Sequence, residues 1–139
     1  MTEKPSSLVK AYRNEEFLSG RDGRPLRILA EYLEPAARFE EQSVSDTIVF
    51  FGSARLIPND EARAALDTAK KNGGDVEAAE QWLEMSRYYE DSRELAARLT
   101  HWSKELEDTK RRFLICTGGG PGIMEAANRG ASEAKGLNM

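Results

Sequence analysis

The sequence feature that most constrains the fold is an apolar run that ends in a glycine-rich bend. The run FLIC, at residues 113–116, is followed by TGGGPG at 117–122 and then by a helical pattern from about 121 to 135. A short apolar run bounded by turn residues is typical of a buried strand. We therefore predict a strand, a bend and a helix, with Gly120 as the helix N-cap and Pro121 as the first helical residue.

A second run, TIVFFGSAR at residues 47–55, ends in the same way. Its first five residues are β-branched or aromatic, which suits a strand of a parallel sheet that is buried on both faces. We predict strands at 47–52 and 112–117, and a third strand that begins at 137–139. If the first two strands are neighbours, FFGSAR and TGGGPG lie side by side at the carboxyl edge of the sheet. The predicted fold class is α/β: a Rossmann-like parallel sheet with helices on both faces, incomplete in this chain, plus an N-terminal helical extension.

The remaining segments read as helices. Residues 7–18 and 25–42 form two predicted helices, and Pro35 is expected to kink or interrupt the second. The predicted domains are an extension over 1–45 and the N-terminal part of a nucleotide-binding domain over 46–139, with a helical insertion at 59–110.

Within that insertion we predict two helices. The first has Asn59 as its N-cap and ends at Gly73–Gly74, and the second is one long helix over 75–106 capped by Asp75. Seven apolar residues of the long helix recur at helical spacing, which favours a face that packs against a sheet or a partner helix over a ligand-binding face. They are Trp82, Met85, Tyr89, Ala96, Leu99, Trp102 and Leu106.

Composition narrows the class of protein. The chain has 139 residues, a net charge of −4 and one cysteine, so an internal disulfide is excluded and a reducing, cytoplasmic setting is expected. No apolar run approaches the roughly 20 residues of a membrane span, and the charge does not favour nucleic acid. His101 is expected at the surface and Cys116 within a strand. We predict no metal, no cofactor, no nucleic acid and no membrane as partners.

The glycine bend itself suggests a ligand. Without side chains, Gly118, Gly119 and Gly120 would let a phosphate or a sugar hydroxyl approach the main chain, and a helix N-terminus would present free N–H groups to it. The alternative is a tight turn that binds nothing. The dinucleotide fingerprint G-x-G-x-x-G is absent, because Ile123 and Glu125 stand where its last glycine would be, and no phosphate-binding P-loop motif is present.

Two charged residues are candidates beside the bend. Arg55 could pair with a phosphate, or it could be a surface arginine that pairs with an acidic helix. Glu125, one turn into the last helix, could face the ligand or stabilise the helix N-terminus.

These motifs together resemble the LONELY GUY (LOG) family, whose members were long described as lysine decarboxylases. The resemblance rests on VFFGSAR at 49–55 and ICTGGGPGIMEAANRGASEAKGLNM at 115–139, and FLSGRDGRPLRILAEYLEPAARF is similar to the helical extension of the longer bacterial branch. It implies a Rossmann-like homodimer that hydrolyses the N-glycosidic bond of nucleoside 5′-monophosphates, such as AMP or a cytokinin riboside monophosphate. The residues that it implies at the nucleotide are Gly52, Ser53, Gly118, Gly119, Gly120, Gly122 and Met124.

The family's second motif, P-G-G-x-G-T-x-x-E, does not occur in the sequence. In the family that motif holds the phosphate and supplies the catalytic glutamate, so no catalytic residue is assigned. We expect the chain to be the N-terminal part of such a hydrolase and to be inactive alone, with its missing half or a second copy as partner. The alternatives are a non-catalytic nucleotide-binding or carrier module, and a helical interaction domain built on residues 75–106.

Overall fold

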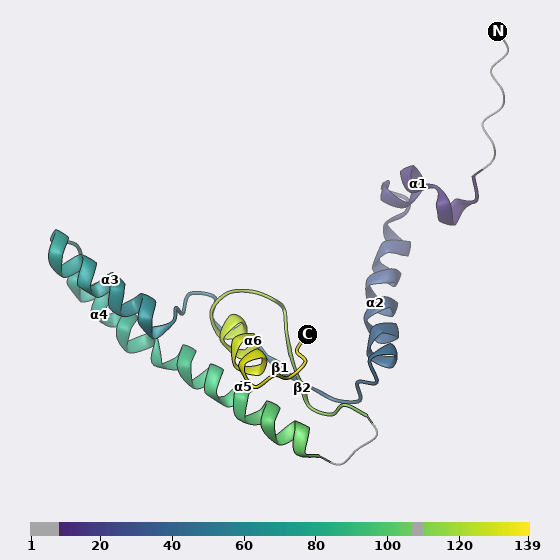
Figure 1. The fold of residues 1–139 in the computed structure, drawn as a ribbon. Helices are drawn as coiled ribbons and strands as arrows, with labels where there is room; N and C mark the ends of the chain where they lie inside the picture. The colour runs from purple at the N-terminus through teal and green to yellow at the C-terminus, as the bar shows by residue number, and fades with distance from the viewer. Residues whose placement is uncertain (1–8, 107–109) are drawn as a thin grey trace, which may run out of the picture. The chain divides into compact units, whose positions relative to one another are not determined.

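The computed structural model describes residues 9–106 and 110–139, which divide after Gln42 into two compact units (Figure 1). Residues 1–8 of the predicted extension and 107–109 of the predicted insertion lie outside the described residues. The N-terminal unit contains a short 3-10 helix (Ala11–Arg13), α1 (Glu15–Ser19) and α2 (Arg24–Glu41). The second unit contains β1 (Thr47–Phe50), α3 (Asn59–Asn72), α4 (Val76–Met85), α5 (Arg87–Glu105), β2 (Leu114–Thr117) and α6 (Ile123–Glu133).

The N-terminal unit differs from its prediction in two places. The expected single helix over 7–18 is wrong within the described residues, because Asn14 has extended backbone angles and its side chain caps α1 by accepting a hydrogen bond from the Phe17 N–H. The expected interruption at Pro35 is also wrong, since α2 continues through it. At its start, α2 is tied to α1 by Arg27, which donates to the carbonyl oxygens of Gly20 and Leu18.

The second unit is built on a small parallel sheet. β1 and β2 are neighbours with Ile48 opposite Ile115, which meets the condition under which the two glycine-bearing loops lie side by side. On the other side of β2, the Met139 N–H donates to the Ile115 carbonyl over 3.0 Å, and Asn138 forms a parallel bridge with Ile115. The predicted third strand therefore does begin here, and the fold is mixed α/β with a parallel sheet.

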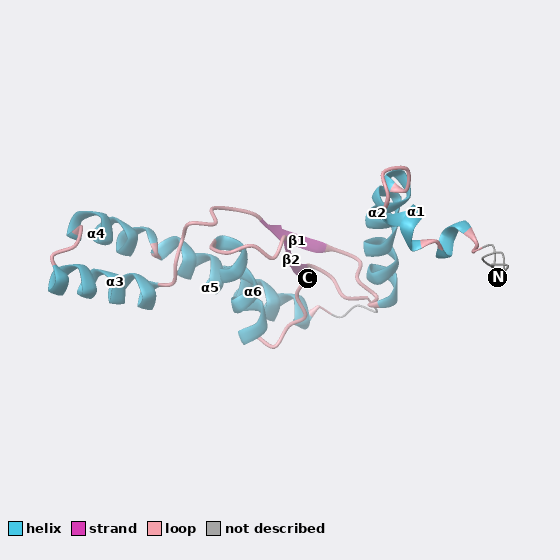
Figure 2. Cartoon of the chain, turned by 90° about the horizontal axis from the view of Figure 1, so that it is seen from above, coloured by secondary structure: helices cyan, strands magenta, loops and turns pink. Residues whose placement is uncertain are grey.

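Helices α5 and α6 pack together on one face of this sheet (Figure 2). Their small residues Ala96, Ala127 and Ala131 are fully buried, and Ile115 packs against them with Ile48 and Phe50 beside it. Side chains alternate along a strand, so Val49 and Phe51 belong to the other face, and they are 66% and 87% exposed. Within this unit, α5 and α6 cover the face of the sheet that bears Ile48 and Ile115.

The helical hairpin α3–α4 projects away from the sheet, and α5 continues in the direction of α4 (Figure 1). Asp75 caps α4 by accepting from the Ala78 N–H over 2.9 Å, and Gly73 ends α3 with a φ of 68°, both as predicted. The first residue of α3 is Asn59, so its predicted role as N-cap is wrong and Pro58 takes that place.

The predicted single helix over 75–106 is wrong, because it divides at Ser86. Ser86 is fully buried; its hydroxyl donates to the Leu83 carbonyl and accepts from the Asn59 side chain over 2.8 Å. The break thus lies at a residue whose hydroxyl contacts both its own helix and a residue distant in sequence. None of the helices within the described ranges is long and apolar enough to cross a membrane.

Candidate functional site

The two glycine-bearing loops meet at the carboxyl edge of the sheet, as the sequence predicts for neighbouring parallel strands. The Ser53 carbonyl accepts a hydrogen bond from the Ile123 N–H over 3.1 Å. A Cβ atom added to Gly52 would lie 2.9 Å from the Ile123 side chain. The loop after β1 and the start of α6 therefore lie in direct contact.

The contact between the two loops requires a glycine at position 122. Gly122 is the N-cap of α6, with φ 74° and ψ −125°, and a Cβ atom on it would lie 2.1 Å from the Ser53 carbonyl oxygen. The prediction that Gly120 caps the helix and Pro121 begins it is wrong, because α6 begins at Ile123. The close approach of the two loops moves the start of the helix by two residues.

Gly118 and Gly119 are the open part of the bend. Gly119 has a φ of 70°, and a Cβ atom added there would have no atom within 4 Å. At Gly118 the nearest atom would be the Met124 sulfur at 3.5 Å, an ordinary contact, while at Gly120 the Met124 Cε atom would lie 2.5 Å away. Met124 thus lies against the bend, and the main chain at 118–119 is accessible to a ligand.

Arg55 is the charged group closest in sequence to this edge. Its backbone N–H donates to the Ser53 hydroxyl over 3.2 Å, which fixes the turn after β1. Its side chain is exposed, and among residues 9–106 and 110–139 it pairs with no carboxylate, so the alternative of an ion pair with an acidic helix is not observed. The guanidinium is available to an anion.

A hollow of about 330 Å³ adjoins the loop after β1. Its lining residues are Ser53, Arg55, Leu56, Gln81, Trp82 and Met85. A second hollow of about 280 Å³ shares Arg55 and Trp82 with the first. The sequence pattern places Trp82 in the packing face of a helix, yet the ring is 41% exposed and lines both hollows. The aromatic residue that is best placed to contact a ligand was therefore not predicted as part of the site.

Glu125 has a structural partner. It lies in the first turn of α6, and its carboxylate accepts a hydrogen bond from the Tyr89 hydroxyl over 3.2 Å. Burial of Tyr89 raises the pKa of its hydroxyl, which therefore stays protonated and able to donate at neutral pH. Its place in the first turn and this bond to α5 account for Glu125 without a ligand.

Thr117 and Asn128 connect the bend to α6, and neither is predicted as part of the site. The Thr117 hydroxyl accepts both the Gly119 N–H at 3.0 Å and the Asn128 side-chain amide at 2.9 Å. The Asn128 carbonyl oxygen Oδ1 is buried and accepts no hydrogen bond from any described residue. This contact links the conformation of the bend to the half-buried side chain of Asn128, and a polar residue inside a helix carries no such signal in the sequence.

The single histidine and the single cysteine lie where the sequence predicts them. His101 is exposed and Cys116 is half-buried in β2. Within the part of the chain that the structure describes, no group of three His, Cys, Asp or Glu side chains could hold a metal ion. No protein-family model matches the chain, and a search of curated proteins gives no significant match.

Proposed function

We propose that this chain is the nucleotide-binding, N-terminal part of a Rossmann-like hydrolase of the LOG type, acting on nucleoside 5′-monophosphates such as AMP. The observation that carries the proposal is the meeting of two glycine-bearing loops at the carboxyl edge of neighbouring parallel strands. In open α/β sheets this edge is where ligands bind. The accessible main chain at Gly118 and Gly119 adds to that argument.

The residues at this edge suit the parts of a nucleotide. The guanidinium of Arg55 has no carboxylate partner among the described residues and offers a positive charge to a phosphate. The exposed part of the Trp82 ring offers a surface for a base, and the adjoining hollow of about 330 Å³ is within the size range of small-molecule sites. Ser53 lies between them.

The proposed reaction is hydrolysis of the N-glycosidic bond. The oxygen of a water molecule bonds to C1′ of the ribose while the bond from C1′ to the base nitrogen breaks and its electron pair leaves on the base. The proton that the water loses is balanced by a proton taken up by the base, which gives the free base and ribose 5-phosphate. A general base for the water is not assigned to any residue of this chain. We therefore propose that binding belongs to this chain and that cleavage requires a segment with the P-G-G-x-G-T-x-x-E glutamate.

Two measurements test this proposal. Calorimetric titration of the chain with AMP, adenosine and ribose 5-phosphate is expected to give binding that is tightest for AMP. Chromatography of AMP incubated with a protein that joins this chain to a segment carrying the glutamate is expected to show free adenine. AMP binding with no adenine release would favour the non-catalytic carrier module. No binding by either protein would refute both functions.

A further inference from the structure

The hollow beside the loop after β1 has one polar side chain to which the proposed function assigns no part. Gln81 lies next to Trp82 on α4 and lines the hollow of about 330 Å³, but not the second hollow. Its side chain is exposed, and its amide makes no hydrogen bond with any other described residue. The amide is therefore available to a ligand in the first hollow.

The other polar side chains of this hollow offer less than Gln81 does. The Arg55 guanidinium can only donate hydrogen bonds, and the Ser53 hydroxyl already accepts one from the Arg55 backbone N–H. The remaining lining residues are apolar or aromatic. Among the side chains that line the hollow, Gln81 thus presents an unused acceptor and an unused donor side by side in one plane, which matches the edge of a base.

The position of Gln81 on α4 suits contact with a base edge. Consecutive residues of a helix project about 100° apart, so Trp82 and Gln81 border the hollow from different directions. A base that stacks on the exposed part of the Trp82 ring can therefore meet the Gln81 amide at its edge.

We propose that Gln81 selects the base of the nucleotide, by pairing its amide with the 6-amino group and N7 of adenine. The inference rests on the proposed function. The amide oxygen accepts from the 6-amino group while the amide nitrogen donates to N7, which is the two-bond pair that glutamine makes with adenine. Guanine and hypoxanthine present two acceptors at the same edge, so the amide oxygen would face an acceptor. The site therefore prefers a 6-amino purine to a 6-oxo purine.

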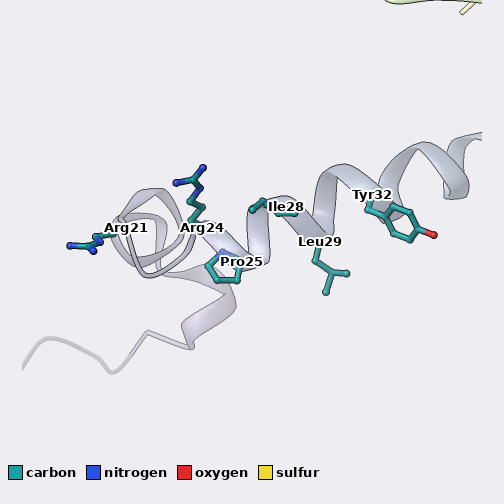
Figure 3. A pocket seen from close by; sticks show the side chains of 6 residues that line it. All are labelled: Arg21, Arg24, Pro25, Ile28, Leu29 and Tyr32. Carbon is teal, nitrogen blue, oxygen red and sulfur yellow. The ribbon is translucent and has the colours of Figure 1, made fainter.

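A larger hollow of about 760 Å³ lies along α2 in the N-terminal unit (Figure 3). Its guanidinium groups, from Arg21 and Arg24, could attract a phosphate. The acceptor among its lining side chains is the Tyr32 hydroxyl, which offers no acceptor and donor in a fixed plane. This hollow is therefore less suited to select a base, and Arg24→Ala serves as a control for binding there.

The test is calorimetric titration of the whole chain with three nucleotides. They are AMP, inosine 5′-monophosphate and the 5′-monophosphate of 7-deazaadenosine, in which a C–H group replaces N7. We expect AMP to bind about tenfold more tightly than either of the others, because each of them loses one bond of the pair.

Gln81→Met removes the amide but keeps the length of the side chain and a good helix former. In this variant the preference for AMP over the 7-deaza nucleotide should disappear, whereas the affinity for inosine 5′-monophosphate should stay nearly unchanged and show that the site is intact. Asn72→Met removes an exposed amide that lines neither hollow, and this matched control should keep the full preference. Arg24→Ala should keep the affinity for AMP.

The outcomes separate this inference from the proposed function. A wild-type chain that binds all three nucleotides alike would overturn the role of Gln81 and leave the proposed function standing. A preference that persists in Gln81→Met, or an affinity for AMP that falls in Arg24→Ala, would also overturn it. A wild-type chain that binds none of the three would refute both.

Discussion

The backbone of Gly130 in α6 lies directly against the carbonyl oxygen of Arg93 in α5: a Cβ atom on Gly130 would lie 2.0 Å from that oxygen. Fully buried alanines on both helices surround this contact. The two helices therefore pack backbone to backbone, and the sheet is covered by helices that small residues bring together.

Gly130→Ala is expected to destabilise the chain. Helix propensity favours alanine over glycine by about 1 kcal/mol, but a backbone carbonyl cannot turn aside as a side chain would, and such overpacking costs about 1–3 kcal/mol. We expect a net loss of about 1–2 kcal/mol in the free energy of unfolding, measured by urea denaturation. Arg63→Ala, at an exposed position of α3, is the control and should stay within about 0.5 kcal/mol. A stabilised Gly130→Ala variant would show that the helices lie further apart.

Stability should depend on pH through Glu133. The Arg93 guanidinium donates to this carboxylate from two nitrogens, at 2.8 and 2.5 Å, and holds the pKa of Glu133 below its ordinary value of 4.5. A pKa lowered by folding adds stability above the ordinary value, and this stability is lost as the pH falls through the folded value.

Glu133→Gln should therefore cost about 0.5–1 kcal/mol at pH 7, a modest figure because the side chain is nearly half exposed. The difference from wild type should be fully present above pH 4.5 and should disappear as the pH falls through the lowered pKa of Glu133, which urea denaturation at several pH values measures. Glu94→Gln, which breaks a more exposed pair with Arg98 within α5, is the matched control and should cost less. Equal losses for the two variants would contradict the importance of the contact between helices.

The glycines of the bend should differ in their tolerance of alanine. Gly122→Ala places a Cβ atom against the Ser53 carbonyl in a backbone conformation open mainly to glycine, and we expect a loss of about 2–4 kcal/mol. Gly119→Ala meets no atom and should cost only about 1 kcal/mol for its positive φ. Thermal unfolding of both variants measures the difference. Equal losses would mean that the two loops are not in contact at Gly122.

Removing the Arg55 side chain should weaken binding of AMP but not of adenosine. No carboxylate among the described residues pairs with this arginine, so Arg55→Ala should leave the fold intact while AMP binding falls about tenfold. Calorimetric titration gives both affinities, with Arg63→Ala as the matched loss of charge. An equal loss for adenosine would show that Arg55 does not act on the phosphate.

The two tryptophans allow the base to be located by fluorescence. Trp82 lines both hollows beside Arg55, whereas Trp102 packs against Phe113 with ring centroids 5.0 Å apart. With Trp102→Phe, the emission of Trp82 should still change when AMP is added. With Trp82→Phe the response should disappear, and a response that persists there would place the base elsewhere.

The two strands and several helix ends follow from the sequence, because local signals determine them. The apolar runs, the positive φ of Gly73 and the cap at Asp75 each depend on residues close in the chain. Contacts between distant residues account for most of the differences. Ser86, where the long helix breaks, is hydrogen-bonded to Asn59, and the Ile123 N–H at the start of α6 is hydrogen-bonded to the Ser53 carbonyl.

Some features of the candidate site can likewise be predicted from the sequence, and others cannot. Its position at the sheet edge is predictable, because neighbouring parallel strands bring their carboxyl ends together. The separate roles of the glycines cannot be predicted. Gly122 lies in a close contact and Gly119 borders open space, but the sequence shows only a glycine at each position. The sequence predicts Trp82 to be a packing residue, because helical spacing does not show which aromatic side chain stays exposed.

The register of the sheet gives the chain a built-in chemical reporter. Cys116 lies opposite Val49, on the face of the sheet that α5 and α6 leave uncovered, and it is the single cysteine of the sequence. A thiol reagent therefore modifies one site per molecule, and the second-order rate constant of that reaction measures how often the face is open to water. Any element that comes to lie over Val49 and Cys116 slows the reaction in proportion to the time it stays there.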